Sequence, residues 1–403
     1  MIDLELIKTC EEELKDCFSY LEDVAFFNQN KVLNAFKKNK IALRHFNGSS
    51  GYGYDDEGRD KLNSLFADIF NAESAICSPF IVSGTHALSL CLFGLTLPGD
   101  KILSITGKPY DTLLDVINKD GVGSLKDYNV SFDYISLKND KIDVEKVLET
   151  ISKTNPKIVY LQRSRGYEWR GALSISEIEN VVKSIRKIGY NGIIMLDNCY
   201  GEFLEKQEAT EVGVNIMAGS MIKNPGGGIA PTGGYVVGDK KYVDLVYNRL
   251  TSPSIGSEVG SYYSGYQYFY QGLFLAPHVV LQAVKGCMLF SSVFTKLGYE
   301  VSPKPFVYPS DIITAIKFND ENKLIKFIQS VQKNSPIDSF VEAYPWEMPG
   351  YNDKVIMAAG CFVQGSSIEI SADAPIKPPY VAYLQGGLTY EHCKILLSNI
   401  ELI

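Results

Sequence analysis

The stretch MAGSMIKNPGGGIAPTGGYVVG, residues 217–238, isolates one lysine, Lys223, among small and apolar side chains. Burial of an ammonium group lowers its pKa, which is how a lysine becomes nucleophilic enough to form a Schiff base near neutral pH. The glycines and prolines that follow keep other side chains away from this amine. An ordinary surface lysine before a flexible loop is the alternative. The segments around Asp197 and Thr85 favour the chemical interpretation.

The segments on both sides of Lys223 predict two strands, over residues 215–222 and 233–238. Upstream, short β-rich runs alternate with helical stretches, which is typical of a mainly parallel sheet with helices on both faces. These earlier runs span residues 75–83, 101–106, 132–137, 157–162 and 192–197. The chain is therefore predicted to have an α/β fold with a seven-stranded, mainly parallel sheet. Ligands collect at the carboxyl ends of such strands.

Three regions are predicted along the 403 residues. Residues 1–47 carry charged and apolar residues at helical spacing and predict an N-terminal helical arm. Residues 48–270 form the large domain that contains the sheet. Residues 271–403 begin with a connecting helix, from about 276 to 298, and continue as a smaller mixed α/β domain.

Composition narrows the class of protein. The net charge of -8 and the pI near 5.3 argue against nucleic acid as a partner. We expect no secretory signal and no membrane segment, because the start is acidic and no apolar run approaches the roughly 18 residues that a span requires. The eight cysteines form no CxxC pair, and with four histidines they show no metal-binding spacing. The sequence therefore predicts a cytoplasmic protein with reduced thiols and no metal.

Ser83, Gly84 and Thr85 stand directly before a hydrophobic helical stretch. Backbone N–H groups at a helix N-terminus, with small hydroxyl side chains nearby, form a cradle for a phosphate dianion. The alternative is that Ser83 or Thr85 simply caps the helix.

Asp197 ends a fully apolar predicted strand, at the edge where open α/β sheets keep their ligands. A carboxylate there needs a partner. If the ligand is a pyridine ring, the anion keeps the ring nitrogen protonated, so that the ring can accept electrons from a carbanion. A capping or loop aspartate is the alternative.

The order of these elements indicates a pyridoxal phosphate site, although no single element is specific. A phosphate cradle follows the first strand, Asp197 closes a later strand, and Lys223 follows in a loop of small residues. A nucleotide P-loop would need GxxxxGK followed by Ser or Thr, whereas Lys223 precedes its glycines and is followed by Asn224.

The sequence resembles the fold-type I pyridoxal phosphate enzymes, and in particular the bacterial aluminium resistance family, related to cystathionine beta-lyase and methionine gamma-lyase. The segments SMIKNPGGGIAPTGGYVVG, RLTSPSIGSEVG, LDNCYGEF, SGTHA and GYGYDDEGRD carry this resemblance. It implies that Lys223 is the Schiff-base lysine, Asp197 the pyridinium partner and Ser220 a phosphate ligand, with residues 83–85 as the phosphate loop. It also places Tyr110 against the cofactor ring, near the leaving group. A core or interface tyrosine is the alternative for Tyr110.

The resemblance also implies a homodimer or homotetramer with shared active sites. In the lyases that this chain resembles, a tyrosine and an arginine from the region of GYGYDDEGRD reach the phosphate of the neighbouring subunit. Tyr54 and Arg59 are the candidates here. The alternative is that Arg59 only pairs with one of the acids at positions 55–57.

Arg163 and Arg165 follow the carboxyl end of a predicted strand, so they are expected at the edge of the sheet where ligands bind. They could clamp a substrate carboxylate in a bidentate way. Related enzymes use an arginine of the small domain for this contact, yet no arginine follows Arg249 in this chain. Recognition of a standard amino acid is therefore in question, and surface solvation is the alternative for both arginines.

The function predicted from the resemblance is a pyridoxal phosphate-dependent carbon–sulfur lyase that acts on a sulfur-containing amino acid. Lys223 would remove the α-proton, Asp197 would stabilise the resulting charge, and Tyr110 would act as the acid for the leaving thiol. Two alternatives stay open. One is another reaction of the same cofactor, such as aldol cleavage, decarboxylation or transamination. The other is a cofactor-binding protein of stress or metal resistance that has no turnover.

Overall fold

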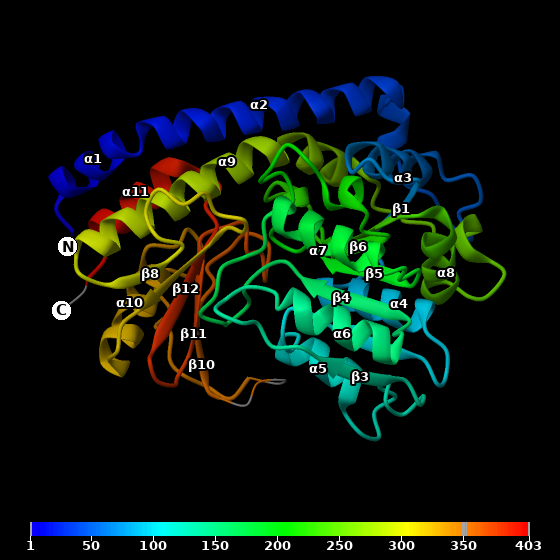
Figure 1. Cartoon of the computed structure of the whole chain (residues 1–403). Helices are drawn as coiled ribbons and strands as arrows, with labels where there is room; N and C mark the ends of the chain where they lie inside the picture. Colours follow the sequence, from blue (N-terminus) through cyan, green and yellow to red (C-terminus); the bar gives the residue numbers. More distant parts are fainter. Residues whose placement is uncertain (1, 349–350, 352, 402–403) are drawn as a thin grey trace.

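The computed structural model describes residues 2–348, 351 and 353–401, and its large unit is built on one sheet (Figure 1). Seven strands follow the order β1-β7-β6-β5-β4-β2-β3. The strands are β1 (Ser74–Ser78), β2 (Lys101–Ser104), β3 (Ser131–Tyr134), β4 (Ile158–Gln162), β5 (Ile193–Asp197), β6 (Ile216–Ser220) and β7 (Gly234–Gly238). Strand β7 is antiparallel to β1 and β6, and the other pairs are parallel. The predicted seven-stranded, mainly parallel sheet is confirmed.

Both faces of this sheet are buried, because successive side chains of a strand point to opposite sides. In β5, Ile193 and Met195 join one apolar cluster, whereas Ile194 and Leu196 join the other. The helices on the first face are α4 (Gly84–Leu95), α5 (Asp111–Asn118) and α8 (Lys240–Leu250). Those on the second face are α3 (Glu57–Ile69), α6 (Val144–Thr154) and α7 (Ile175–Lys187).

The carboxyl ends of the central strands bring functional residues to one edge of the sheet. Gln162 at the end of β4 pairs with Asp197 at the end of β5. Ser220, the last residue of β6, pairs with Gly234, the first residue of β7. The loop that carries Lys223 therefore leaves the sheet and returns to it at neighbouring positions.

A second, antiparallel sheet has the strand order β10-β11-β12-β9-β8. Its strands are β8 (Glu300–Ser302), β9 (Ile313–Lys317), β10 (Val355–Ala358), β11 (Ser371–Pro375) and β12 (Val381–Gln385), and it carries the helices α10 (Glu321–Lys333) and α11 (Tyr390–Asn399). This unit confirms the predicted smaller C-terminal α/β domain. Residues 361–370 form a loop before β11. The carboxylate of Glu369 holds that loop, because it accepts hydrogen bonds from the N–H groups of Phe362 and Val363.

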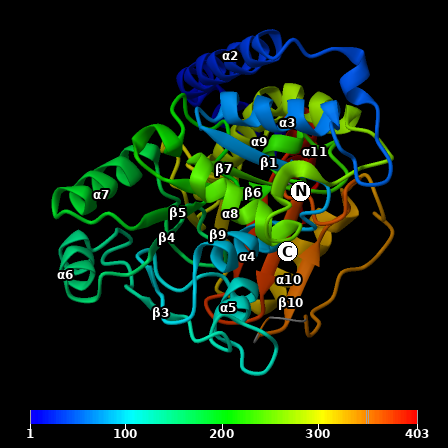
Figure 2. The same cartoon turned by 90° about the vertical axis from the view of Figure 1, so that its right-hand side faces the viewer.

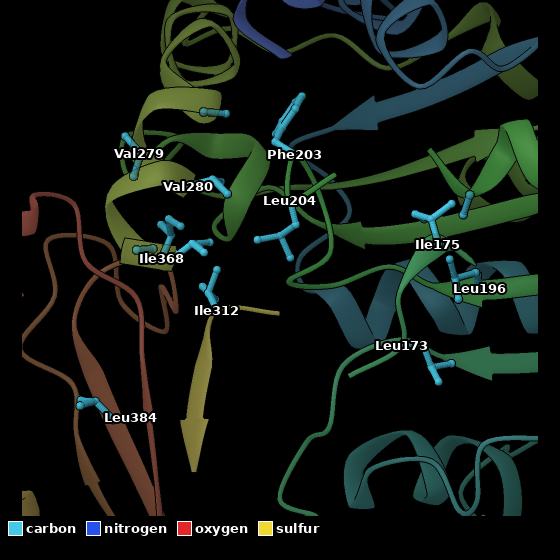
Figure 3. Packing of buried hydrophobic residues seen from close by; sticks show 14 of the residues in the cluster. Leu173, Ile175, Leu196, Phe203, Leu204, Val279, Val280, Ile312, Ile368 and Leu384 are labelled. Carbon is cyan, nitrogen blue, oxygen red and sulfur yellow. The ribbon is translucent and has the colours of Figure 1, made fainter. Parts of the chain in front are cut away.

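Helix α9 (Gln267–Lys296) runs along both units, and α2 (Lys15–Lys38) lies beside it after α1 (Leu4–Glu13) (Figures 1 and 2). The predicted boundary between residues 270 and 271 falls inside α9, because the helix begins before the predicted connecting segment. Figure 3 shows Val279 and Val280 of α9 beside Ile312 and Ile368 of the second unit. The same helix thus contributes to the core that joins the two units.

Helix α9 is also long and apolar enough to cross a membrane, judged by length and composition alone. The expectation that no apolar stretch approaches that length is therefore wrong. However, 67% of its most apolar window is buried inside the protein, as in the core helix of a folded domain.

Candidate active site

A cavity of roughly 510 Å³ opens at the carboxyl edge of the large sheet and is closed on its other side by the second sheet. It brings together most of the residues that the sequence singled out. Those that line it are Ser83, Gly84, Thr85, Tyr110, Arg165, Asp197, Ser220 and Lys223. Asp373, Tyr383 and Gln385 line it from the second sheet.

Lys223 follows β6 closely, and its Nζ lies 4.0 Å from the centroid of the Tyr200 ring. Burial lowers the pKa of its ammonium group, but the acidic groups of Cys199, Tyr200 and Asp197 raise the pKa, and their effect is the greater. The expectation that burial leaves this amine with a lowered pKa is therefore wrong. Lys223 is positioned as an ammonium group in an acidic surrounding.

Asp197 is buried, with its Oδ1 accepting a hydrogen bond of 3.0 Å from the backbone N–H of Cys199. Burial raises the pKa of this carboxyl group, and the nearby charge of Lys223 lowers it again. A carboxylate in such a place is stabilised by a cation, so a positively charged ring nitrogen in the cavity would suit it.

The N-terminus of α4 forms the predicted cradle beside Ser220. Ser83 is the N-cap of this helix, and its Oγ accepts a hydrogen bond of 3.0 Å from the His86 N–H, so the capping alternative holds for Ser83. At Gly84 a Cβ atom would stand 3.2 Å from the Sγ of Cys199 and 3.5 Å from the Cβ of Ser220. A side chain at this position would narrow the space beside the Ser220 hydroxyl.

Tyr110 precedes α5, and its hydroxyl donates a hydrogen bond of 3.1 Å to the Oγ1 of Thr85. Its backbone N–H donates to the Oε1 of Gln162 at 3.2 Å, which fixes the tyrosine to the end of β4. Burial and the charge of Asp197 raise the pKa of this phenol well above its usual range. Tyr110 therefore keeps its proton at neutral pH.

Arg163 is a structural residue, contrary to the prediction that it clamps a substrate. Its side chain is buried and does not line the cavity. The guanidinium donates to the carboxylate of Glu205 at 2.8 Å, and its remaining hydrogen bonds hold the loops around it together. Their acceptors are the Oδ1 of Asn198 and the backbone carbonyls of Leu173 and Gly201.

Arg165 does line the cavity, but most of its donors are engaged. Its Nε donates to the Oδ2 of Asp311 at 3.2 Å, and its Nη1 donates to the backbone carbonyl and the hydroxyl of Ser302. Only Nη2 forms no hydrogen bond with a described residue. A bidentate clamp is therefore not available at Arg165 without breaking one of these contacts.

Tyr54 and Arg59 do not line this cavity within a single chain. Tyr54 is 63% exposed, and its ring lies 5.5 Å from that of Tyr52. Arg59 is buried, where it pairs with Asp60 at 2.9 Å and donates to the Gly53 carbonyl. The predicted contact of both residues with a neighbouring subunit stays a prediction.

Tyr200 and Glu202 were missed by sequence reasoning, although both lie within the segment LDNCYGEF that begins just before Asp197. Tyr200 adopts a left-handed conformation with φ of 70°, which is strained for a residue with a side chain and is often found at functional sites. Its hydroxyl lies 2.9 Å from the Oγ of Ser367. The aromatic residue three places after Asp197 was the available signal.

Glu202 is fully buried behind the strand that leads to Lys223. Its Oε1 accepts a hydrogen bond of 2.6 Å from the Tyr235 hydroxyl, and its Oε2 has no partner among the described residues. Burial raises the pKa of this carboxyl to about 7. The Nδ2 of Asn224, which follows Lys223 in the sequence, donates a hydrogen bond of 3.0 Å to the backbone carbonyl of Glu202. Glu202 therefore supports the loop that carries Lys223.

Solved structures share the fold over nearly the whole chain. A Clostridium acetobutylicum protein, described provisionally as a cystathionine beta-lyase involved in aluminum resistance, is 49% identical with a TM-score of 0.96 over 99% of this chain and 95% of its own. A Clostridium novyi NT protein, described as a carbon-sulfur lyase involved in aluminum resistance, is 48% identical. The match has a TM-score of 0.94 and covers 98% of this chain and 95% of that protein. The pyridoxal-5'-phosphate dependent protein YhfS of Escherichia coli is 15% identical with a TM-score of 0.62 over 94% and 96%, which shows the fold alone. The fold is that of the fold-type I pyridoxal phosphate enzymes.

Sequence comparison agrees with these structures. The uncharacterized protein YnbB of Bacillus subtilis (strain 168) is 47% identical over 388 residues, which cover 95% of this chain and 92% of that protein. The model of the methionine gamma-lyase family matches residues 3–401. The chain therefore belongs to the methionine gamma-lyase family.

Proposed function

We propose that this protein is a pyridoxal phosphate-dependent carbon–sulfur lyase that acts on a sulfur-containing amino acid. The observation that carries the proposal is that the amine of Lys223 and the carboxylate of Asp197 line one cavity, beside the hydroxyl-rich N-terminus of α4. Membership of the methionine gamma-lyase family supports it, as does the similarity to solved proteins that are described as lyases involved in aluminum resistance.

The residues of the cavity fit the cofactor. Gly84 leaves room where a Cβ would stand 3.2 Å from the Sγ of Cys199, and the hydroxyl of Ser220 lies beside this space, as a phosphate group requires. Lys223 would hold the cofactor through Nζ, and Asp197 would pair with the ring nitrogen. When bound, the cofactor supplies an electron sink for the charge that forms at the substrate α-carbon.

Each residue then has a distinct part in the reaction. Lys223, released when the substrate takes its place, would accept the α-proton on Nζ. Asp197 would remain ionised and balance the positive charge of the ring nitrogen. Tyr110, whose phenol is protonated at neutral pH, would donate its proton to the departing sulfur. Elimination in this way releases a thiol, and water then converts the remainder into a keto acid and ammonia.

The cofactor and its anchor are tested together by visible absorption of the purified protein, before and after borohydride, followed by mass mapping. We expect a yellow protein that borohydride bleaches, with the modified lysine at position 223. Lys223→Ala should abolish both the label and turnover, because transfer of the α-proton contributes roughly 10² to 10⁴ in rate. Lys240→Ala, at an exposed lysine outside the cavity, is the matched control. A protein that stays colourless after addition of pyridoxal phosphate would remove the proposal.

The substrate is tested by the products of cystathionine and methionine. Both eliminations release ammonia and a thiol, but pyruvate as the keto acid indicates elimination from the β-carbon, whereas 2-oxobutyrate indicates elimination from the γ-carbon. No release from either compound, in a protein that carries the cofactor on Lys223, would argue against the lyase assignment.

The surroundings of the reaction are also part of the proposal. We propose a homodimer or homotetramer in the cytoplasm, with Tyr54 and Arg59 contributing to the site of a neighbouring copy. Sedimentation of the wild type and of Arg59→Ala, together with their cofactor content, would test this arrangement. A monomer that retains its cofactor would contradict it.

A further inference from the structure

The wall of the cavity opposite the large sheet is acidic and aromatic. Asp373 of β11 and Tyr383 of β12 are cross-strand partners, and both line the cavity. Tyr167, from the loop after β4, packs against Tyr383 with ring centroids 5.3 Å apart and against Tyr351 at 5.7 Å. We call these four residues, Asp373, Tyr167, Tyr351 and Tyr383, the acidic box.

Among the residues that the structure describes, Asp373 has neutral partners and no cationic one. The Nε2 of Gln385 donates to its Oδ2 at 3.2 Å, and the neutral phenol of Tyr167 also favours the ionised form of Asp373. Burial raises the pKa of this carboxyl to about 6, and only those two neutral groups lower it. Asp373 is thus mostly ionised at neutral pH without forming an ion pair among the described residues.

Four cationic side chains line the cavity. The Nζ of Lys108 lies 5.4 Å from the centroid of the Tyr134 ring and that of Lys223 lies over Tyr200, while the other two cations are engaged with acids. Lys377 pairs with Asp353 at 2.8 Å, and Arg165 pairs with Asp311. Asp111, in the first turn of α5, also lines the cavity and forms no ion pair within the described part of the chain. Burial raises the pKa of Tyr351, and the charges of Asp373 and, to a smaller extent, Asp111 raise it further, so this second carboxylate adds to the negative field at the box.

An ionised carboxylate among tyrosine rings is a binding site for a cation. The faces of aromatic rings carry partial negative charge, so they attract an ammonium group that lies within about 6 Å. A buried carboxylate without a counter-ion gains further when such a group arrives. A neutral or anionic group placed there would leave the negative charge of Asp373 without a counter-ion.

The acidic box and the reactive lysine line the same cavity. Tyr200, whose ring centroid lies 4.0 Å from the Nζ of Lys223, lines this cavity as well. A substrate that reacts at Lys223 can therefore extend past Tyr200 toward Asp373.

We propose that the acidic box binds a positively charged group at the far end of the substrate side chain. The preferred substrates are then amino acids with an ammonium group beyond the sulfur atom. This inference rests on the proposed lyase function.

The kinetic test compares three substrates that differ only in the charge of the terminal group. They are S-(2-aminoethyl)-L-cysteine, its neutral isostere S-propyl-L-cysteine and the anionic S-carboxymethyl-L-cysteine. We expect kcat/KM to be about 10- to 100-fold higher for the cationic compound than for the neutral one, as a charge-assisted contact provides. Asp373→Asn should reduce this ratio to near one, whereas Asp373→Glu, which keeps the charge, should retain much of it.

A binding test separates the box from the reaction. L-Lysine and 2-aminoheptanoate match the first two substrates in length but contain no carbon–sulfur bond. Calorimetry on the purified protein should show tighter binding of lysine, and Asp373→Asn should remove the difference. This comparison does not depend on any elimination reaction.

The outcomes are distinguishable. Turnover of all three compounds with no charge preference in the wild type would overturn the acidic box and leave the lyase function intact. A lysine preference that disappears in Asp373→Asn, without turnover of any sulfur compound, would support the box and overturn the lyase function. A charge preference that persists unchanged in Asp373→Asn would assign recognition of the cation to other residues and overturn the inference.

Discussion

The Nζ of Lys223 lies over the ring of Tyr200, 4.0 Å from its centroid, while the hydroxyl of the same tyrosine contacts Ser367 of the second unit. An ammonium group over an aromatic face gains about 0.5–2 kcal/mol. Tyr200 therefore stabilises the protonated form of the lysine and links it to the wall on the far side of the cavity.

Replacement of this ring should change the pH at which Lys223 reacts. Tyr200→Leu removes the aromatic face, so the amine should lose its proton about one pH unit lower, since one unit corresponds to about 1.4 kcal/mol. Tyr200→Phe keeps the ring and loses only the contact with Ser367. The measurement is the pH dependence of borohydride-fixed cofactor on Lys223 in each variant. Identical profiles for Leu and Phe would exclude a role for the ring.

Tyr110→Phe should impair departure of the sulfur. Without the phenol proton, we expect kcat/KM for an alkyl thiol leaving group to fall by roughly 10²-fold to 10⁴-fold. A substrate whose aryl thiolate leaves without a proton should be affected far less. The rates with both leaving groups, together with the cofactor content of the variant, check this prediction. An equal loss for the two substrates would point to a defect in positioning.

Glu202 should make the folded state less stable as the pH rises. Its pKa is about 7 in the folded protein and 4.5 in the unfolded chain, so between these values the folded state binds more protons. The free energy of unfolding should therefore fall with rising pH across this window, by on the order of 3 kcal/mol from this group. Urea unfolding at pH 5 and pH 8 measures the difference.

Glu202→Gln is the matched variant, because an amide oxygen can still accept the hydrogen bond from Tyr235. It should show a smaller loss of stability over the same interval. Asp197 and Asp373, whose pKa values are also raised, contribute in the same direction in both proteins. Parallel stability profiles for the wild type and the variant would contradict the prediction.

Substitutions of Arg163 and Arg165 should have different effects, the first on stability and the second on KM. Arg163→Met leaves the carboxylate of Glu205 and several buried acceptors without a donor, so the free energy of unfolding should drop by about 3 kcal/mol. Of the two arginines, Arg165 is the one that lines the cavity. The main effect of Arg165→Lys should therefore be a higher KM and not a lower free energy of unfolding. Denaturant unfolding and steady-state kinetics on both variants make the comparison. A raised KM for a stable Arg163→Met protein would restore its predicted role.

Local pattern was enough to predict the large sheet and much of the candidate site. The buried parallel strands β2, β4, β5 and β6 each end at a polar residue, as β5 ends at Asp197. Because parallel strands present their carboxyl ends at one edge, the phosphate cradle, Asp197 and Lys223 could be expected to meet before any coordinates were known.

Long-range packing could not be predicted in the same way. Arg163 and Arg165 stand two positions apart, and only the fold around them determines that Arg163 meets Glu205 whereas Arg165 meets Asp311. The position of Asp373 depends on its pairing with Tyr383 and on the docking of the second sheet, which leave no periodic signal in the sequence. The direction of the Lys223 pKa likewise depends on Cys199 and Tyr200, whose loop folds beneath the amine.

The pairing of Ser220 with Gly234 has a consequence for the tether of the reactive amine. Both ends of the loop 221–233 are fixed side by side, and the loop is tightly packed: a Cβ at Gly226 would stand 1.8 Å from the Met221 carbonyl oxygen, and one at Gly227 would stand 2.4 Å from the Gly272 carbonyl oxygen. The loop therefore has little room to absorb extra chain. An inserted or deleted residue here would displace Nζ from the ring of Tyr200 and from Asp197, whereas the same change in an exposed turn would be tolerated. The length of this loop, as much as the identity of its lysine, is therefore a constraint on how such a sequence can vary.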